Sequence, residues 1–547
     1  MNNAVYNFAH PHNEPIFSYA PGTMHRAKLM QEIDKQSSEV IDIPLVINGK
    51  EVFTEKKIQV VMPHDHGHIL AHCSYAGPKE INLAADAAIH ARQAWMNLSW
   101  IDRASIFLKA ADMISTKYRY QLNAATMLGQ SKNAFQAEID SACEVIDFLR
   151  FNAFYASEIY SRQPASEMEN LNRLDYRPLE GFILSITPFN FTAIASNLNA
   201  APALMGNTLV WKPATSSLLS NYTLMKIFLE AGLPDGVINF VPSSGRDISA
   251  NILTNKHLAG IHFTGSTGTF NHLWRTTGEN LANYISYPKL VGETGGKDFI
   301  MVHPSANIDE VCTAMIRGAY EYQGQKCSAA SRAYIPESMW EELKPELVEQ
   351  INNIKMGDVR DFNNFVNAVI DEASFRTIKG YIDFSANSTE AKIIAGGATN
   401  SGKGYFIKPT LIETTNPHFK TMEEEIFGPV LTVFVYKDDE FEKTLEICDQ
   451  TSPYALTGSI FSKDRYALEL ASKKLQYSAG NLYYNDKPSG AVVGQQPFGG
   501  ARASGTNDKS GSYMNLLRWL SPRTIKETFL PATDYNYPFM SGNGKEV

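Results

Sequence analysis

Cysteines are few in this chain, and long apolar runs are missing altogether. The five cysteines are odd in number and form no CxxC pair: Cys73, Cys143, Cys312, Cys327 and Cys448. This spacing argues against a disulfide framework and against a zinc site, so we expect free thiols and no metal. No apolar stretch approaches the roughly eighteen residues that a membrane-spanning helix needs. We therefore expect no membrane partner.

Positive charge is outweighed by negative charge. The 49 Lys and Arg residues face 58 Asp and Glu residues, which gives a net charge of −9 and a pI near 5.9. This balance disfavours nucleic acid as a partner, because a phosphate backbone attracts basic surfaces. The first residues show no apolar signal core, and Glu14, Glu32 and Asp34 fit a transit peptide poorly. We expect a cytoplasmic protein, with the mitochondrial matrix as the alternative.

The rest of the composition is that of an ordinary globular protein, and 547 residues predict two or three domains. Residues 1–40 contain several prolines and no sustained period, which predicts an irregular arm. Asn48-Gly49 lies between two apolar pairs and predicts a tight hairpin over 45–52. Apolar residues recur at helical spacing over 79–100, and further helical patterns continue to about residue 158.

From residue 174 onwards, short apolar runs alternate with helical stretches, which predicts an α/β protein with parallel sheets. The first series has predicted strands at 181–186, 208–211, 236–241 and 260–263, and predicted helices at 192–205, 217–231 and 246–256. The second series has predicted strands near 299–303, 331–336, 429–436 and 456–461. Such sheets bind ligands at the carboxyl ends of their strands. The cofactor candidates are therefore Thr187, Lys212 and the run 264–269.

Cys327 lies in a loop of small and polar residues, an arrangement that leaves a thiol accessible to a substrate. Glu293 and Glu425 lie on either side of it along the chain in Gly-containing segments, and Asn190 follows a predicted strand. A side-chain amide can stabilise an oxyanion, and a carboxylate can activate a hydrolytic water. Singly, each residue has an ordinary alternative: a strand-to-helix turn at 264–269, a solvated Lys212, a turn Asn190 and a structural Glu293.

Seven motifs occur in the order and approximate spacing of the aldehyde dehydrogenase superfamily, which the chain resembles. They are Pro188-Phe-Asn-Phe, Trp211-Lys-Pro-Ala, Phe263-Thr-Gly-Ser, Glu293-Thr-Gly-Gly-Lys, Gly324-Gln-Lys-Cys, Glu425-Ile-Phe-Gly-Pro and Pro497-Phe-Gly-Gly. Three further segments resemble the branch that acts on L-glutamate γ-semialdehyde: Gln136-Ala-Glu-Ile-Asp140 followed by Glu144, Gln323 to Ser328, and Gly494 to Asp508.

The resemblance implies a Rossmann-type NAD-binding domain and an α/β catalytic domain with the active site between them. The NAD-binding domain would comprise 41–171 and 179–291, and the catalytic domain 292–490. Residues 172–178 and 521–547 would form a small oligomerisation arm, so a homo-oligomer, at least a dimer, is expected. Residues 491–520 would return to line the active site.

The resemblance also implies a role for each matching residue. Cys327 would be the nucleophile, Asn190 an oxyanion donor and Glu293 the base for thioester hydrolysis. The residues expected to bind NAD are Thr187, Lys212, Gly265, Ser266, Thr267, Gly268, Thr269 and Glu425. Those expected to bind the substrate are Phe191, Lys326, Ser328, Gly490, Ala491, Phe498 and Glu144. Glu144 has an equal alternative as a helix-surface carboxylate.

Two departures from the family pattern concern the cofactor. Many members that prefer NAD carry an acid shortly after the Lys-Pro pair, where this chain has Thr215 and Ser216. We expect NAD as the cofactor, with NADP as the alternative. Many members have Gly at the position of Phe270, so a change in helix packing is expected there.

The activity that the resemblance implies is NAD-dependent oxidation of L-glutamate γ-semialdehyde, in equilibrium with its cyclic imine, to L-glutamate. This is the second step of proline breakdown. The chain length leaves no room for a flavin barrel, so a separate proline dehydrogenase is the implied pathway partner. Two alternatives remain at this point: an enzyme for another semialdehyde or an aliphatic aldehyde, and a non-catalytic dinucleotide-binding or structural protein on the same fold.

Overall fold

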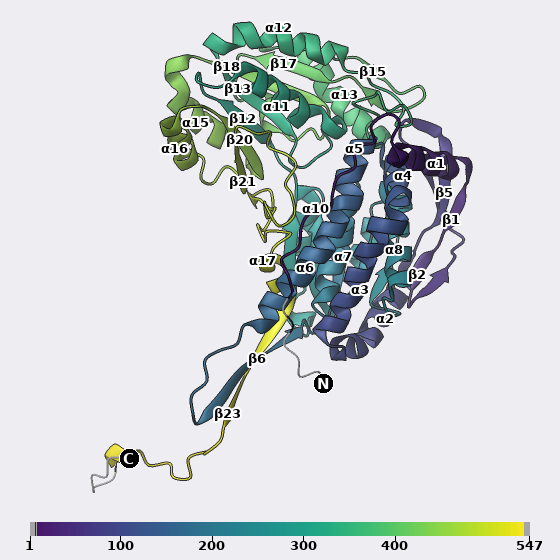
Figure 1. The fold of residues 1–547 in the computed structure, drawn as a ribbon, viewed down its shortest axis with the longest axis vertical. Helices are drawn as coiled ribbons and strands as arrows, with labels where there is room; N and C mark the ends of the chain where they lie inside the picture. The colour runs from purple at the N-terminus through teal and green to yellow at the C-terminus, as the bar shows by residue number, and fades with distance from the viewer. Residues whose placement is uncertain (1–5, 7, 541–547) are drawn as a thin grey trace.

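A seven-stranded sheet organises the first half of the computed structural model, which describes residues 6 and 8–540 (Figure 1). The strand order is β11-β10-β7-β8-β9-β2-β3, with β11 to β9 parallel and the last two antiparallel. The strands are β2 (Leu45–Ile47), β3 (Lys50–Val52), β7 (Phe182–Ile186), β8 (Thr208–Lys212), β9 (Ile238–Phe240), β10 (Leu258–Thr264) and β11 (Lys289–Glu293). The predicted parallel strands are confirmed. The predicted hairpin is confirmed too, because Asn48 and Gly49 join β2 to β3 with φ values of 51° and 71°.

Helices cover both faces of this sheet. Successive residues of β7 point to opposite faces, so Ile183 joins the core under α3, α6, α7 and α8, whereas Phe182 and Leu184 join the core under α2, α9 and α10. The helices are α2 (Pro78–Asn97), α3 (Trp100–Met113), α4 (Arg119–Gln130), α5 (Ala134–Ala137), α6 (Glu144–Ser161), α7 (Thr192–Leu204), α8 (Leu218–Ala231), α9 (Gly245–Ile252) and α10 (Thr267–Glu279), with π-helical turns η1 (Ile114–Tyr118) and η2 (Glu138–Cys143). Helix α9 ends four residues before its predicted end.

A second seven-stranded sheet has the order β14-β17-β18-β13-β12-β20-β21 and is parallel except for β14. Its strands are β12 (Asp298–Val302), β13 (Ala330–Pro336), β14 (Ala391–Ala395), β17 (Thr410–Thr414), β18 (Val430–Tyr436), β20 (Thr457–Phe461) and β21 (Asn481–Tyr484). The accompanying helices are α11 (Ile308–Tyr320), α12 (Glu337–Asn353), α13 (Glu372–Ala386), α14 (Lys420–Glu423), α15 (Phe441–Gln450) and α16 (Arg465–Lys474). The α/β class expected from the alternating pattern is therefore confirmed.

Smaller elements complete the fold. A two-stranded ribbon of β6 (Asn170–Pro178) and β23 (Leu520–Thr528) projects away from the body (Figure 1). The others are β1 (Ile41–Ile43), β4 (Lys57–Met62), β5 (Asp65–Ser74), β15 (Thr399–Asn400), β16 (Phe406–Ile407), β19 (Tyr454–Ala455), β22 (Ala501–Arg502), α17 (Tyr513–Leu517) and the 3₁₀ turns η3 (Thr215–Ser217), η4 (Leu281–Asn283), η5 (Glu321–Gly324), η6 (Asp438–Glu440) and η7 (Pro538–Met540). Residues 541–547 of the expected arm lie outside the described part of the chain. In residues 6 and 8–540, no helix is long and apolar enough to cross a bilayer.

The expectation of an irregular arm over 1–40 is wrong for its second half. Helix α1 (Met24–Ser38) begins after Thr23, whose side chain accepts a hydrogen bond from the backbone N–H of Arg26. Leu29 and Ile33, one helical turn apart, are buried. The sequence pattern was weak because these two side chains supply nearly the whole apolar stripe.

Candidate active site

The loop that carries Cys327 is held in a strained conformation. Tyr322, Gln323 and Gly324 have consecutive positive φ values of 52°, 55° and 66°. Such a backbone is costly for residues other than glycine and persists only where its surroundings hold it. At position 324 a side chain would also collide, because a Cβ would lie 2.2 Å from the carbonyl oxygen of Gly428. Glycine is thus required three residues before the nucleophile candidate.

Buried hydrogen bonds hold this loop against the first half of the chain. The Gln323 Nε2 donates to the carbonyl oxygens of Ser131 at 3.0 Å and Ala368 at 2.8 Å. The Tyr322 hydroxyl donates to the carbonyl oxygen of Gln130 at 2.9 Å. The small and polar residues of this loop predicted an accessible thiol but gave no sign of these contacts. The structure shows that two of its side chains anchor it.

A cavity of about 310 Å³ brings the predicted catalytic and substrate residues together. Nine of them line it: Cys327, Glu293, Phe191, Phe498, Lys326, Ser328, Gly490, Ala491 and Glu144. They come from both halves of the chain and from the segment after residue 490. This convergence is the main structural observation about the site, because residues up to some 350 positions apart in sequence meet around one thiol.

Burial controls the titration of the two reactive groups. The Cys327 side chain is only 8% exposed, and burial raises its pKa well above the usual value, as do the nearby carboxylates of Glu293, Asp298 and Glu425. Burial also raises the pKa of Glu293 to about 8, an effect that Lys509 partly offsets. The Glu293 Oε1 is buried without a hydrogen-bond partner in the described residues. A carboxyl with a pKa near neutrality and a vacant oxygen is suited to proton transfer.

Asn190 lies beside the nucleophile loop. Its Nδ2 donates to the carbonyl oxygen of Gln325 at 3.1 Å, two residues before Cys327, and the side chain is buried. It is not among the residues that line the cavity wall, although its neighbour Phe191 is. An amide has two N–H donors, so the one that Gln325 does not use is available to an oxyanion.

The π-helical turn η2 shapes one wall of the cavity. Widened turns of this kind often occur at functional sites, and here Ile139, Asp140 and Cys143 of η2 line the cavity. Glu144 follows directly and also lines it, so its alternative reading as a surface carboxylate is wrong. Burial, followed by the charge of Asp140, raises the pKa of Glu144 well above its usual value.

Lys326 is less free to bind a substrate than its sequence position suggested. Its Nζ lies 3.3 Å from Glu321 and 3.9 Å from Asp140, and the residue is buried. Lys132 was missed by the sequence analysis because a lysine after a helix usually indicates solvent exposure. It is fully buried, donates to Asp140 at 2.5 Å and lies 4.2 Å from the centre of the Phe191 ring.

The residues expected to bind the dinucleotide, apart from Glu425, lie at the carboxyl edge of the first sheet. The backbone N–H of Thr187 donates to the carbonyl oxygen of Lys212 at 3.2 Å, and burial lowers the Lys212 pKa. Ser266 caps α10 by accepting from the Thr269 N–H at 3.3 Å. A Cβ on Gly268 would meet no atom within 4 Å, so the first turn of this helix is open to an anion.

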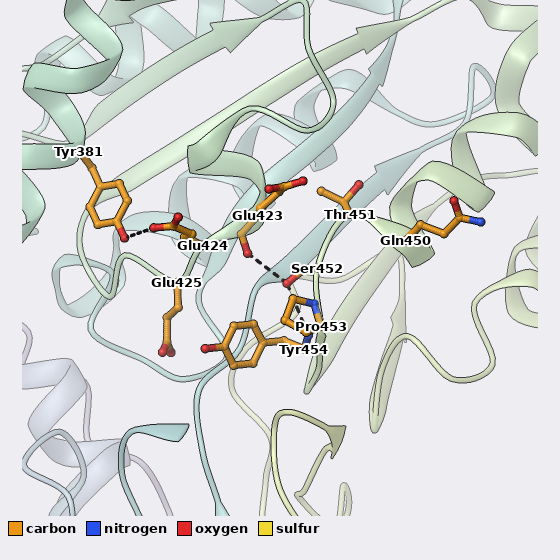
Figure 2. A pocket seen from close by; sticks show the side chains of 9 residues that line it. All are labelled: Tyr381, Glu423, Glu424, Glu425, Gln450, Thr451, Ser452, Pro453 and Tyr454. Carbon is orange, nitrogen blue, oxygen red and sulfur yellow. Dashed lines mark hydrogen bonds between the residues drawn. The ribbon is translucent and has the colours of Figure 1, made fainter. Parts of the chain in front are cut away.

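Glu425 borders an open cleft of about 750 Å³ on the other side of the site, which Figure 2 shows. Its carboxylate points away from the hydrogen-bonded pair of Tyr381 and Glu424. Its Oε1 accepts from the Gly296 N–H at 3.1 Å, and burial raises its pKa to about 7. The Tyr454 hydroxyl on the same cleft hydrogen-bonds to Thr267, and burial raises the pKa of that phenol, an effect that this bond partly offsets. The cleft therefore adjoins the first turn of α10.

Phe270 fills space that glycine residues leave open. Its ring stacks on Phe263 at 5.5 Å and occupies the position that a Cβ of Gly292 would need, at 2.2 Å. The expected change in packing is therefore an added aromatic contact between α10 and the strands β10 and β11. No cluster of three or more metal-ligating side chains occurs within the described ranges.

The chain is similar in sequence and in structure to proteins of one family. A model of the aldehyde dehydrogenase family matches residues 51–525. The chain is 52% identical to the protein named delta-1-pyrroline-5-carboxylate dehydrogenase, mitochondrial, of Dictyostelium discoideum, over 98% of this chain and 96% of that relative. A solved structure of the delta-pyrroline-5-carboxylate dehydrogenase from Mycobacterium tuberculosis bound with NAD aligns with a TM-score of 0.96 and 47% identity, covering 99% of this chain and 100% of that one. Proline utilization A (PutA) from Bdellovibrio bacteriovorus aligns with a TM-score of 0.90 and 30% identity, covering 95% of this chain and 53% of that one. The chain belongs to the aldehyde dehydrogenase family.

Proposed function

We propose that the protein oxidises L-glutamate γ-semialdehyde to L-glutamate with NAD as cofactor. The observation that carries this proposal is the single cavity in which Cys327, Glu293, two aromatic rings and the loop at Gly490 meet. The Dictyostelium and Mycobacterium relatives are named as dehydrogenases of pyrroline-5-carboxylate, and one structure of the Mycobacterium protein is bound with NAD. Pyrroline-5-carboxylate, the compound in those names, is the cyclic imine that is in equilibrium with the semialdehyde.

The first chemical step is the attack of the Cys327 sulfur on the aldehyde carbon. The thiol has a raised pKa in the resting site, so its S–H proton must first pass to solvent to give the attacking thiolate. The carbonyl oxygen gains the charge, and the side-chain amide of Asn190 together with the Cys327 backbone N–H would stabilise it. Bound NAD supplies the hydride acceptor for the oxidation of this adduct.

The second step is the hydrolysis of the thioester that remains on Cys327. Glu293 lines the same cavity with an unpartnered oxygen and would accept a proton from the attacking water. Oxygen adds to the thioester carbon and the sulfur leaves, so the products are a carboxylic acid and the free thiol.

The cofactor would lie along the carboxyl edge of the first sheet. The open first turn of α10 fits the pyrophosphate, and Lys212 and Glu425 would hold the two riboses. Thr187 and the run from Gly265 to Thr269 would supply the remaining contacts.

The domain division and the assembly are also proposals. The two sheets support an NAD-binding domain over 41–171 and 179–291 and a catalytic domain over 292–490. The projecting ribbon of β6 and β23 supports an oligomerisation arm, and light scattering would measure the resulting assembly. The name of the Dictyostelium relative favours the mitochondrial matrix over the cytoplasm, which cell fractionation would test. A separate proline dehydrogenase would supply the substrate.

The test is the rate of NADH formation with L-glutamate γ-semialdehyde, succinate semialdehyde and propionaldehyde, with NAD and with NADP. We expect the highest kcat/KM for L-glutamate γ-semialdehyde with NAD. A higher kcat/KM for either shorter aldehyde would support the alternative of a sister aldehyde dehydrogenase. We also expect Cys327→Ser to lose dehydrogenase turnover and to keep NAD binding in a calorimetric titration. Near-normal turnover in that variant would contradict the mechanism.

A further inference from the structure

The N-terminal segment reaches the substrate cavity. Asn13, Glu14 and Ile16 line it together with Cys327, although they precede the nucleophile by more than 300 positions in sequence. Ile16 is 55% exposed and therefore lies where the cavity wall meets solvent. We call residues 10–19 the N-terminal strap.

A buried ion cluster fixes the strap in place. The Glu14 carboxylate pairs with Arg119 at 2.6 Å and with Arg150 at 2.7 Å. The backbone N–H of Phe17 donates to Glu138 Oε1 at 2.9 Å. Arg119 is 1% exposed, so removing the strap would leave its charge buried with fewer partners, which is strongly unfavourable. The strap is therefore a constant part of the cavity wall.

Asn13 joins this strap to both sides of the cavity mouth. Its Nδ2 donates to Asp147 Oδ2 on α6 at 2.9 Å and to the carbonyl oxygen of Val493 at 2.8 Å. Its Oδ1 accepts from the Gln495 Nε2 at 2.8 Å. Both partners of the Nδ2 are acceptors, so only one orientation of the amide satisfies all three bonds.

The loop 490–496 depends on this bridge and on one close contact. Gly494 has a φ of 81°, and a Cβ there would lie 2.1 Å from the ring of Phe151 on α6. The loop thus rests on α6 at Gly494, and Asn13 holds it on either side of that residue, at Val493 and Gln495. Gly490 and Ala491 at the start of the loop line the cavity.

We propose that the N-terminal strap is the outer wall of the substrate cavity and that Asn13 is a positioning residue for loop 490–496. The strap would set the position of Gly490 and Ala491 toward the substrate. This role rests on the proposed function, which assigns those two residues to the α-carboxylate of the semialdehyde. Specificity for a carboxylate-bearing aldehyde would then depend on a side chain that does not itself bind the substrate.

The kinetic test compares Asn13→Ala with His12→Ala in the full chain, since His12 is an exposed neighbour on the same strap. We expect Asn13→Ala to raise KM for L-glutamate γ-semialdehyde about tenfold, because a loop that loses two hydrogen bonds no longer presents its amides to the carboxylate. The kcat, the KM for NAD and the KM for propionaldehyde should stay within about twofold of wild type. His12→Ala should match wild type throughout.

A second variant tests the same role in case Asn13→Ala does not fold. Gln495→Ala removes one bond at an exposed side chain, and we expect a smaller rise in the same KM, about twofold to threefold. An unchanged KM in both folded variants would overturn the positioning role.

The wall is tested without any substrate by the rate at which N-ethylmaleimide alkylates Cys327, followed by peptide mass. We expect Asn13→Ala to raise this rate at least about threefold over His12→Ala, because the thiol is otherwise enclosed. Equal rates would overturn the role of Asn13 in closing this wall. If the wild-type protein did not oxidise the semialdehyde, the proposed function would fail, and the alkylation rates would still decide about the wall.

Discussion

We expect the carboxyl group of Glu293 to determine the pH dependence of turnover. Its pKa of about 8 means that about a tenth of the molecules carry the ionised base at pH 7, about half at pH 8 and about nine tenths at pH 9. Only the ionised form can accept a proton from water. If hydrolysis limits turnover, kcat should therefore rise about fivefold from pH 7 to pH 8 and less than twofold from pH 8 to pH 9.

The decisive variant is Glu293→Gln, which keeps the shape of the side chain and removes the base. We expect the rise in kcat between pH 7 and pH 9 to disappear and the steady-state rate to fall by about a hundredfold or more. The first step needs no hydrolytic base, so a rapid mixing experiment should show a burst of NADH close to one per active site, followed by a slow phase. Acid quenching and mass measurement should then find the acyl group on Cys327.

Two results would refute this reasoning. One is a pH profile in Glu293→Gln with the wild-type midpoint, since the titrating group would then be another residue, with Cys327 the first candidate. The other is a variant that shows no burst and an unchanged kcat. A control with added hydroxylamine separates the steps, because hydroxylamine attacks the thioester without a base. It should restore turnover in Glu293→Gln and leave Cys327→Ser inactive.

Three further changes test other parts of the site. Phe270→Ala should lower the free energy of unfolding by about 3 kcal/mol, seen as a lower thermal midpoint, because the ring is buried between helix and strands. Gly324→Ala should lower kcat sharply through its collision with the Gly428 carbonyl oxygen, whereas Gly380→Ala, at an open helical position, should leave kcat unchanged. Lys212→Met should raise KM for NAD about tenfold and leave KM for the semialdehyde nearly unchanged, as measured by steady-state kinetics.

The positions of the strands along the chain were predictable because the sequence signals for buried strands are local. Buried parallel strands appear as short apolar runs, and β7, β8, β10, β12, β13, β18 and β20 all lie within two residues of their predicted bounds. The hairpin strands β2 and β3 were also predictable, because the turn at Asn48 and Gly49 needs residues that tolerate positive φ. Helix α1 was missed because its apolar stripe amounts to two residues.

The sequence provides candidates for the nucleophile and its base, but it does not predict the residues that support them. Lys132 pairs with Asp140 and lies over the Phe191 ring, and Gln323 donates to a distant backbone carbonyl, contacts that no local pattern encodes. The same holds for Asn13, whose partners Val493 and Gln495 follow it by some 480 positions. Asn13 lies in an N-terminal segment without a regular sequence pattern, so nothing in the sequence indicated that its side chain reaches the cavity.

The cavity is lined by more acidic than basic residues, yet its proposed substrate carries a carboxylate. The protonation and pairing of the acidic side chains explain how both can hold. Counted by residue type, acids outnumber bases around it, which would repel a carboxylate. Burial raises the pKa of Glu144 well above its usual value and that of Glu293 to about 8, which reduces the negative charge that these two carboxyl groups contribute. Glu321 is paired with Lys326 at 3.3 Å, and Glu14 is paired with arginines outside the cavity. The field at the thiol is thus much less negative than the sequence suggests, and it becomes more negative as Glu293 ionises. Substrate binding should therefore weaken at the same alkaline pH at which hydrolysis becomes fastest, and a measured rise in KM above pH 8 would separate the two effects.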